Sequence, residues 1–452
     1  IEFSDWSSDV CSSDLLLSKL IADPNGQFNI DNVRQVVGNL KVADNNVRKQ
    51  AEELLDKIKL SNPSKFTACM LVLIQGAQNE QERLALIVYL STAMKKSVKG
   101  GNGEDIVLFN TLTPEFKAAF IQIVLLIVQS ETSVKVISNV SELISSFVAC
   151  VSQNDVDGQP TFASGYFQVV ASLTTSQMQT QRMLGYMLIP AFVLFLSSVE
   201  RQKCIDMLAA ILNTGLNDTD PHVVLDAIDA YYTCAFIYKD DQDNEATNTG
   251  ALQKLQKSMD SLVNDYKKLL TSGDVDLIEA TIKSLSQTTS LPKEFVKPYV
   301  LLLVQGISNN ILANQQIDDE MKMSAMDSLL DVVGPFKLAF KRTAEVTTIP
   351  MYMYQWLSMK DDDMSSFNEC KEDDEEAVDI ARDLVSKTTE LFGGELMFSF
   401  ITNVISSTPQ MTWKQRWAAM EWVRLSLQGG KFYYKKEDVM KKLFEIATTY
   451  MK

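Results

Sequence analysis

Apolar residues recur at three- and four-residue intervals along almost the whole chain. The stretch 47–58 is typical, because its apolar residues follow one another at the spacing that places side chains on one face of an α-helix, namely Val47, Ala51, Leu54, Leu55 and Ile58. No run of alternating apolar and polar residues is long enough to predict a sheet. The pattern therefore predicts an all-α protein.

The predicted helices come in pairs that repeat at a near-constant interval. The mean spacing is roughly 46 residues, inside the ~40–47 range of HEAT and armadillo repeats and longer than the ~33–34 of tetratricopeptide and ankyrin repeats. We therefore predict an α-solenoid of HEAT repeats with about nine to ten helical pairs. The second helices are expected to begin near Asp44, Glu80, Glu131, Ser176, Asp220, Asp274, Asp318, Glu375 and Met411.

Three of the spacings are long, and each contains a polar insertion. The insertions are residues 99–113, 239–250 and 360–376. Because insertions in a repeat array usually form loops on one face, we expect them to leave the stack of helices intact. The chain ends at Lys452, just after a helical stretch that lacks a polar capping repeat, and this predicts a fragment of a longer solenoid.

The chain has 452 residues, too many for one ordinary hydrophobic core, and 46% of them are apolar. Stacked helical pairs bury such a composition as one continuous core and leave a long inner wall that wraps a partner. The first fifteen residues, IEFSDWSSDVCSSDL, do not follow the helical pattern and look like translated cloning or adapter sequence. We exclude residues 1–15 from the fold.

The net charge of −16 and the pI of about 4.7 indicate which classes of partner the chain attracts. An acidic surface repels phosphate backbones and anionic lipids, and it attracts basic protein segments. Direct nucleic-acid binding is therefore not expected. The longest uncharged run, 183–199, is interrupted by Pro190, and we interpret it as a buried helix, with no membrane insertion.

Residues with catalytic chemistry are scarce. The only histidine is His222, which leaves almost no scope for a catalytic triad, and no phosphate-binding or dinucleotide-binding glycine motif is present. Asp226 and Asp229 fit the polar face of an amphipathic helix. We expect no enzyme activity, no cofactor and no metal. The cysteines have no zinc-binding spacing, and those in helical stretches are expected to be buried free thiols: Cys69, Cys150, Cys204 and Cys234.

Two segments resemble a known family. Residues 33–58 read VRQVVGNLKVADNNVRKQAEELLDKI and resemble the first repeat of importin-β (karyopherin-β) nuclear transport receptors. Residues 351–378, followed by LFGGELMFSFI and TWKQRWAAMEWV, resemble the importin-five (karyopherin β3) subgroup, in which two acidic stretches interrupt a repeat. The order and separation of the segments agree with the family. The resemblance covers 20–452 and corresponds to the N-terminal half of such a receptor.

The resemblance implies a nuclear import receptor that shuttles between cytoplasm and nucleus. Such a receptor binds basic cargo with a nuclear-localisation signal and releases it when Ran-GTP binds the N-terminal repeats. Nucleoporin FG repeats are further partners. On this basis residues 16–198 would bind Ran, and residues 199–452 would bind cargo. Ser91 and Thr92 depart from the family, which usually has Lys-Asn or Arg-Arg there.

The candidate Ran-binding residues are polar positions of the first two repeats. They could equally form an ordinary solvated face, and Lys95 and Lys96 also suit a helix C-terminus. The candidates are Glu52, Asp56, Thr92, Lys95 and Lys96.

The insertion 360–376 is a candidate electrostatic arm that competes for basic cargo or contacts Ran. The alternative is a solvated loop, extended by repulsion between its charges. The residues assigned to the arm are Asp361, Asp362, Asp363, Glu372, Asp373, Asp374, Glu375 and Glu376.

Three tryptophans lie on one predicted helix. Trp413 and Trp417 are four residues apart and are expected to face the core. Trp422 falls off that face, beside Glu421. An exposed indole next to a carboxylate would hold a lysine of the cargo by cation–π attraction and charge. Glu421 and Trp422 are therefore the candidate cargo contacts.

Two other functions use the same fold. One is a HEAT-repeat scaffold subunit, of the phosphatase type or an assembly platform, which needs no Ran site and no acidic insertion. The other is the helical front end of a large enzyme such as a giant kinase. An export receptor would also share the architecture, so import is implied only by the subgroup resemblance.

Overall fold

The structure is a computed structural model. It describes residues 30–39, 42–95, 97–99, 105–154, 160–244, 249–341, 345–359, 376–408, 410–429, 433 and 435–450. The chain forms two compact units, Ile1–Ile237 and Tyr238–Lys452.

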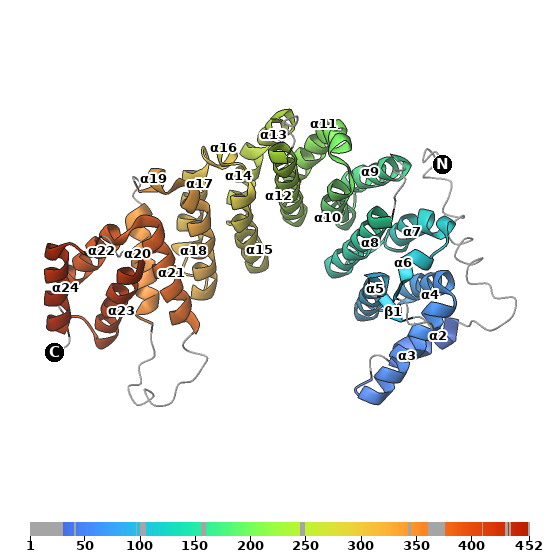
Figure 1. Ribbon diagram of the computed structural model, residues 1–452, viewed down its shortest axis with the longest axis horizontal. Helices are drawn as coiled ribbons and strands as arrows, with labels where there is room; N and C mark the ends of the chain where they lie inside the picture. The colour runs from blue at the N-terminus through green and yellow to red at the C-terminus, as the bar shows by residue number, and fades with distance from the viewer. Residues whose placement is uncertain are drawn as a thin grey trace. The chain divides into compact units, whose positions relative to one another are not determined.

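The described part of the first unit is a series of helical pairs, and the second helices of its middle pairs pack on one another (Figure 1). Thus α5 lies against α8, and α8 lies against α10. The pairs are α2 (Ile30–Asn39) with α3 (Asn45–Ser61), α4 (Pro63–Gly76) with α5 (Glu80–Lys95), α7 (Pro114–Ile127) with α8 (Val134–Asn154), α9 (Pro160–Thr174) with α10 (Gln179–Phe195), and α11 (Ser198–Leu216) with α12 (Pro221–Asn244). The last residues of α12, from Tyr238 on, belong to the second unit.

The second unit repeats this arrangement, with α15 on α18, α18 on α21 and α21 on α23. Several of its first helices are divided into short segments. The elements are α13 (Thr249–Gln256), α14 (Met259–Leu269), α15 (Val275–Leu285), η1 (Ser286–Ser290), α16 (Lys293–Val296), α17 (Val300–Ile307), η2 (Ser308–Leu312), α18 (Asp319–Val333), η3 (Gly334–Phe336), α19 (Lys337–Phe340), α20 (Glu345–Leu357), α21 (Glu376–Phe392), α22 (Gly394–Ser407), α23 (Trp413–Gly429) and α24 (Glu437–Tyr450).

The predicted all-α solenoid of helical pairs is confirmed. Each second helix begins within three residues of its predicted start. Capping explains several of these starts, because a side-chain oxygen satisfies an otherwise unpaired amide of the first turn. Oδ1 of Asp44 accepts from the Asn46 amide at 2.7 Å, and Oδ1 of Asp318 accepts from the Met321 amide at 2.8 Å.

The core lies between the two layers of each stack. In the first unit, the rings of Phe120 on α7 and Phe147 on α8 stack with their centroids 4.3 Å apart. The uncharged run around Pro190 is the buried helix α10, in which Tyr186 and Leu188 are fully buried, as predicted. No helix within the described ranges is long and apolar enough to cross a membrane.

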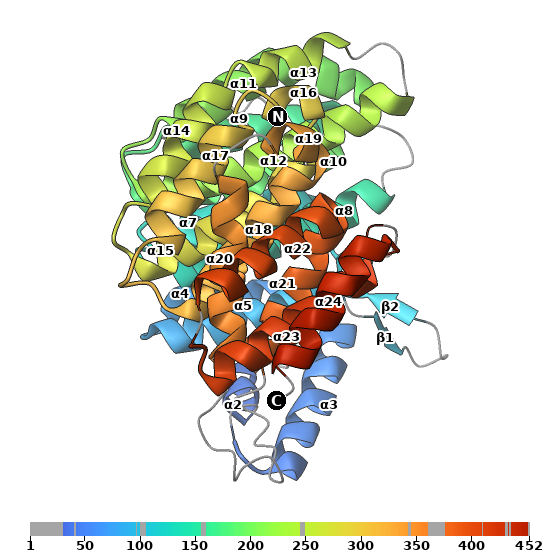
Figure 2. The same cartoon turned by 90° about the vertical axis from the view of Figure 1, so that its left-hand side faces the viewer.

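The insertion after α5 differs from the prediction, because it is not simply a loop. Strands β1 (Ser97–Lys99) and β2 (Asp105–Val107) form an antiparallel pair in which Val98 is opposite Ile106. Figure 2 shows them standing to one side of the helices. The short helix α6 (Leu108–Thr111) follows, and Phe109 packs edge-on against Phe147. The apolar end of this insertion thus joins the core.

The described cysteines carry free thiols. Cys69 and Cys234 are buried, as expected, whereas Cys150 and Cys204 are half-buried. Burial raises the pKa of the Cys69 thiol to about 12, so this thiol stays protonated and unreactive at neutral pH.

Candidate partner-binding surfaces

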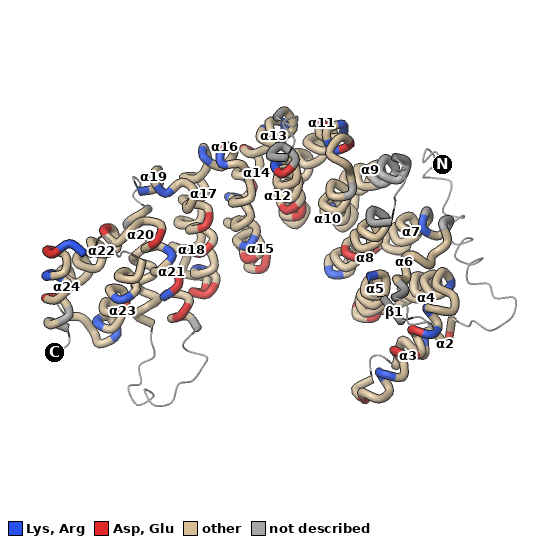
Figure 3. The backbone as a smooth tube through the Cα atoms, viewed as in Figure 1, with Lys and Arg blue, Asp and Glu red and all other residues tan. Residues whose placement is uncertain are grey.

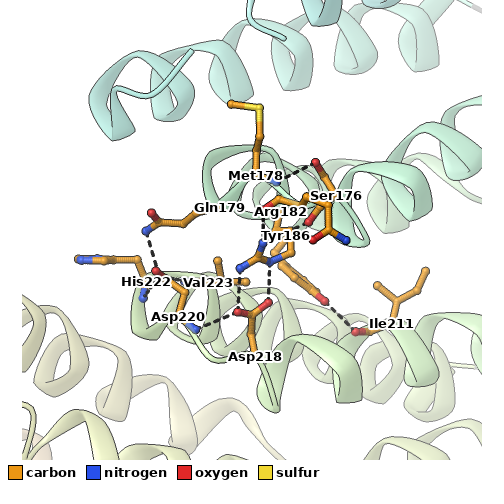
Figure 4. Close-up of polar contacts among 11 residues, drawn as sticks. Ser176, Met178, Gln179, Arg182, Tyr186, Ile211, Asp218, Asp220, His222 and Val223 are labelled. Carbon is orange, nitrogen blue, oxygen red and sulfur yellow. Dashed lines mark hydrogen bonds and ion pairs between the residues drawn. The ribbon is translucent and has the colours of Figure 1, made fainter. Parts of the chain in front are cut away.

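An arginine–carboxylate pair holds α10 against the turn that precedes α12. Nε of Arg182 lies 2.7 Å from Oδ2 of Asp218, and Nη2 lies 3.0 Å from Oδ1 (Figure 4). Burial alone would raise the pKa of Asp218, but the hydrogen bonds and charge of Arg182, with backbone amide donors, lower it overall. The same arginine donates from Nη1 to the carbonyl of Ser176 at 3.1 Å. One side chain therefore connects two consecutive repeats.

A related contact occurs earlier in the first unit. Nε of Arg83 lies 2.9 Å from Oε2 of Glu131 as an ion pair without hydrogen-bond geometry, and its Nη1 donates to the carbonyl of Ala77 at 3.2 Å. Both Arg83 and Arg182 donate to a carbonyl six residues earlier, and both pair with a carboxylate three residues before the next second helix. In both places an arginine of one second helix therefore pairs with the turn that precedes the next second helix.

A polar groove lies between α5 and α8. It has a volume of about 350 Å³ and is lined by Val88, Ser91, Thr92, Lys95 and Glu142. Thr92 and Lys95 are exposed, as expected for a binding surface. With one cation and one anion among its lining residues, the groove is mixed in charge rather than acidic. The structure thus brings two of the candidate Ran-binding residues together in a hollow that sequence reasoning did not foresee.

The other candidate Ran-binding residues lie on the opposite side of α5. Glu52 is exposed on α3, whereas Asp56 pairs with Nζ of Lys59 at 2.7 Å. Burial raises the pKa of Tyr89 on α5, and the charges of Asp56 and Glu52 raise it further, so these carboxylates lie close to that tyrosine. The α5 helix therefore has candidate residues on both flanks. Lys96 lies outside the described residues, and the binding roles remain predictions.

An exposed acidic row follows the second helices of the second unit. Figure 3 shows acidic residues on α15, α18 and α21. Helix α18 contains four carboxylates and a single lysine. The sequence showed an excess of Asp and Glu over Lys and Arg, but it is the stacking of these helices that brings the carboxylates together. The acidic row consists of the exposed residues Asp276, Glu279, Glu320, Asp327, Asp379, Asp383 and Glu390 and the half-buried Asp331.

A lysine of the same unit, Lys387, neutralises part of the negative charge of the acidic row. Nζ of Lys387 on α21 lies 2.6 Å from Oδ1 of Asp327 and 2.7 Å from Oδ1 of Asp331, both on α18. Burial alone would lower the pKa of Lys387, but these two carboxylates raise it overall. Other carboxylates form no ion pair with any described residue and remain for a partner, namely Asp276, Glu320, Asp383 and Glu390.

The prediction that Trp422 is exposed is wrong. Its side chain is fully buried, its Nε1 donates to the carbonyl of Met397 at 3.1 Å, and its ring lies 4.9 Å from that of Phe400. The reason is that α22 packs on the face of α23 that contains Trp422. Trp422 has no indole face left for a cargo lysine.

The expected partner of Trp422 is engaged as well. Glu421 pairs with Arg382 at 2.9 Å and with Arg424 at 2.6 Å, and the pKa of its carboxyl is lowered, chiefly by the Arg424 hydrogen bond. Trp413 and Trp417, expected in the core, are only half-buried. The guanidinium carbon of Arg382 lies 5.6 Å from the Trp417 ring centroid. A cation–π contact therefore exists on this helix, but within the protein and on Trp417.

The predicted acidic arm lies almost wholly outside the described residues. Residues 360–375 are not described, and Glu376 is the first residue of α21. Its proposed role stays a prediction. No group of His, Cys, Asp and Glu side chains in the described ranges has a metal-binding arrangement.

Sequence reasoning missed two buried carboxyl groups, those of Asp226 and of Asp265 on α14. Asp226 on α12 has an Oδ2 atom that is buried and has no hydrogen-bond partner in the described structure. Burial raises its pKa well above the ordinary value, and the charges of Asp229 and Asp220 raise it further. The apolar residues Val223 and Ala230, three positions before and four positions after Asp226 on the same helix face, are a signal in the sequence that this position is less solvated than a polar face would be.

Comparison with known proteins shows the fold. No family model matches the chain, and no curated protein matches it. Solved structures of Kap121p match 92% of this chain at 18% identity, with TM-scores of 0.69 for Kap121p bound to RanGTP, 0.68 for Kap121p bound to Pho4p and 0.67 for Kap121p bound to Nup53p. The chain spans 38% of the length of these structures. It therefore has the fold of the karyopherin HEAT-repeat solenoids.

Proposed function

We propose that this chain is part of a nuclear transport receptor of the karyopherin-β family, which binds basic cargo and releases it to Ran-GTP. The observation that carries the proposal is the fold likeness over 92% of the chain to Kap121p, a protein solved in complex with RanGTP. The sequence resemblance at residues 33–58 and 351–423 supports the same family. The importin-five subgroup, and with it the import direction, rests on the sequence resemblance alone.

Ran-GTP is assigned to the first unit. The groove between α5 and α8 combines exposed apolar surface from Val88 with the hydroxyl of Thr92 and the ammonium of Lys95. A hollow of mixed polarity suits a folded protein surface better than a highly charged peptide. Glu52 and Asp56, on the far side of α5, extend this surface toward the first repeat.

Basic cargo is assigned to the acidic row of the second unit. Lysine and arginine side chains of an extended segment would reach the unpaired carboxylates of α15, α18 and α21 in turn. Long-range attraction to so acidic a chain speeds encounter with basic partners. The acidic residues of 360–376 would add to this field. Nucleoporin FG repeats and shuttling between cytoplasm and nucleus belong to the same proposal, and no catalysis is part of it.

The Ran assignment is tested by binding of the chain to GTP-locked Ran and to Ran-GDP in biolayer interferometry. We expect binding of the GTP form only. Lys95→Glu should weaken it about tenfold, the scale of losing one well-placed interface charge. The matched control is Lys203→Glu, which reverses an exposed lysine on α11, the first helix of its pair. This variant should leave binding unchanged. Absence of GTP-dependent binding would refute the proposal, and a stable complex that ignores Ran would favour a scaffold.

The cargo assignment is tested with a fluorescent Lys-rich peptide. Asp383→Asn combined with Glu390→Gln removes two unpaired carboxylates and should weaken binding severalfold. The control Glu294→Gln removes an exposed carboxylate from the first-layer helix α16. Binding should also weaken from low to high salt, because exposed charges are screened. Affinity that is unchanged by salt would contradict an electrostatic mechanism.

A further inference from the structure

A small apolar groove lies in the second unit, at the C-terminal ends of successive second helices. Its floor is aliphatic, formed by Leu291, Val296 and Val332, and its rim contains Pro335 and Phe336. The lining residues come from three neighbouring parts of the stack, namely the end of α12, the segment from η1 to α16, and the segment from α18 to η3. Asp331 of the acidic row directly precedes Val332 on α18, but no member of the acidic row lines the groove.

The size of this groove limits what it binds. Its volume of about 70 Å³ accommodates a single aliphatic side chain. Pockets for small-molecule ligands and cofactors are larger, roughly 300–1,000 Å³. A groove that accepts one side chain is instead typical of a pocket that binds one anchor residue of a short peptide segment.

Two lysines give the groove a charge opposite to that of the chain. Lys239 and Lys293 line it, and no carboxylate does. Nζ of Lys239 donates to the carbonyl of Ser290 at 3.5 Å, which holds this ammonium at the edge of the groove. Neither lysine forms an ion pair with a described residue. Asp240 and Glu294 directly follow these lysines in the sequence and are exposed, but they do not line the groove. In a protein of net charge −16, two lysines without an ion pair beside an apolar groove are a distinctive local feature.

Ordinary helix electrostatics explain only one of the two lysines. Lys239 lies toward the C-terminal end of α12, where the helix dipole favours a cation. Lys293 lies on α16, a single turn of four residues in which it belongs to both the first and the last turn, so the helix dipole gives no preference for a cation there. Lys337 likewise lies on a single turn, the four-residue helix α19, and Figure 3 shows basic residues on both short helices. The positive charge on this edge therefore does not follow from local helix stability.

We propose that this groove binds a short acidic segment of a partner protein. One aliphatic side chain of the segment sits over Leu291, Val296 and Val332, and carboxylates on either side of it meet Lys239 and Lys293. This site goes beyond the proposed transport function, because the segment it accepts has the charge opposite to that of basic cargo. It does not depend on Ran binding or on the acidic row.

Fluorescence polarisation with two labelled peptides tests the site on the whole chain. The probe EELEE contains a central leucine, and EEGEE has the same charge without it. We expect saturable binding of EELEE and at least fivefold weaker binding of EEGEE. Lys239→Glu/Lys293→Glu should weaken EELEE binding at least tenfold, because each ion pair changes to repulsion. The milder Lys239→Gln/Lys293→Gln variant should give a smaller loss in the same direction.

The matched control reverses two exposed lysines elsewhere in the second unit, Lys257→Glu/Lys267→Glu, and should change EELEE binding less than twofold. Circular dichroism melting curves establish that the variants fold. The proposal is overturned if EELEE shows no saturable binding, if EEGEE binds equally well, or if the control variant loses as much affinity as the groove variant.

Discussion

Removing the side-chain charge of Arg182 should loosen the junction between the α9–α10 and α11–α12 pairs. The guanidinium makes two short contacts to Asp218, at 2.7 and 3.0 Å, and the two side chains are only 17% and 10% exposed. Breaking a fully buried pair costs about 3–5 kcal/mol, and exposed pairs contribute about 0.2–1 kcal/mol. For this partly shielded pair we expect a coupling free energy of about 2 kcal/mol, between those limits.

A double-mutant cycle of Arg182→Met, Asp218→Asn and the double variant isolates this coupling. Because repeat arrays open locally, hydrogen exchange of amides in 176–186 and 214–224 is a sharper measure than global melting. A loss of about 2 kcal/mol corresponds to roughly 30-fold faster exchange through local opening. The control is the cycle for Lys283 and Glu279, which are 68% and 48% exposed and should couple far more weakly.

The pH dependence of this coupling has a definite sign. The pKa of Asp218 is lowered in the folded chain, so the pair stabilises the fold above the unfolded pKa of about 3.9. This contribution is lost as the pH falls through the folded pKa. The wild-type chain and the Arg182→Met variant should therefore converge in stability in strong acid. A cycle for Arg182 and Asp218 that couples no more than the exposed control pair would refute the reasoning.

Three further predictions follow from single side chains. Gly215→Ala should lower the melting temperature, because its Cβ would lie 2.4 Å from the Tyr186 ring, whereas Gly38→Ala meets nothing within 4 Å and should stabilise slightly. Asp226→Asn should raise the free energy of unfolding at pH 7 by about 1–3 kcal/mol. Because the pKa of Asp226 is raised in the folded chain, the wild-type chain loses stability as the pH rises above the unfolded pKa of about 3.9. The stability gained by Asp226→Asn should therefore vanish near pH 3, where the wild-type carboxyl is protonated in both states, and urea titrations at the two pH values measure this. Lys387→Met should tighten binding of a Lys-rich peptide severalfold in fluorescence polarisation, because it frees two carboxylates; unchanged or weaker binding would contradict a role for the acidic row.

The helical pairs could be predicted from the sequence because their signals are local. The apolar period, the polar breaks and cap residues such as Asp44, Asp274 and Asp318 all act within a few residues. The starts of the second helices therefore agree with the structure to within three residues. The hairpin of β1 and β2 was missed because strands of three residues are too short for alternation to show.

The surfaces could be predicted only in part, because packing between helices decides them. Trp422 and Trp417 are both on α23, and the position of α22 determines which of them is buried. Likewise, Lys387 bridges carboxylates about sixty residues earlier in the chain, and no sequence spacing indicates that contact. Thr92 and Lys95 were identified from the resemblance, but their groove depends on how α8 lies beside α5. Local patterns thus predict elements, and tertiary contacts select the side chains that remain available to partners.

The central claim is that the chain exchanges basic cargo for Ran-GTP, and the most direct test is the coupling between the two ligands. A fluorescent Lys-rich peptide is titrated with the chain in the presence of saturating GTP-locked Ran, and again with Ran-GDP. The account predicts that GTP-locked Ran weakens peptide binding at least fivefold, the lower end of about 5–150-fold for coupled sites, and that Ran-GDP has no effect. Peptide affinity that is identical with and without bound GTP-locked Ran would contradict it.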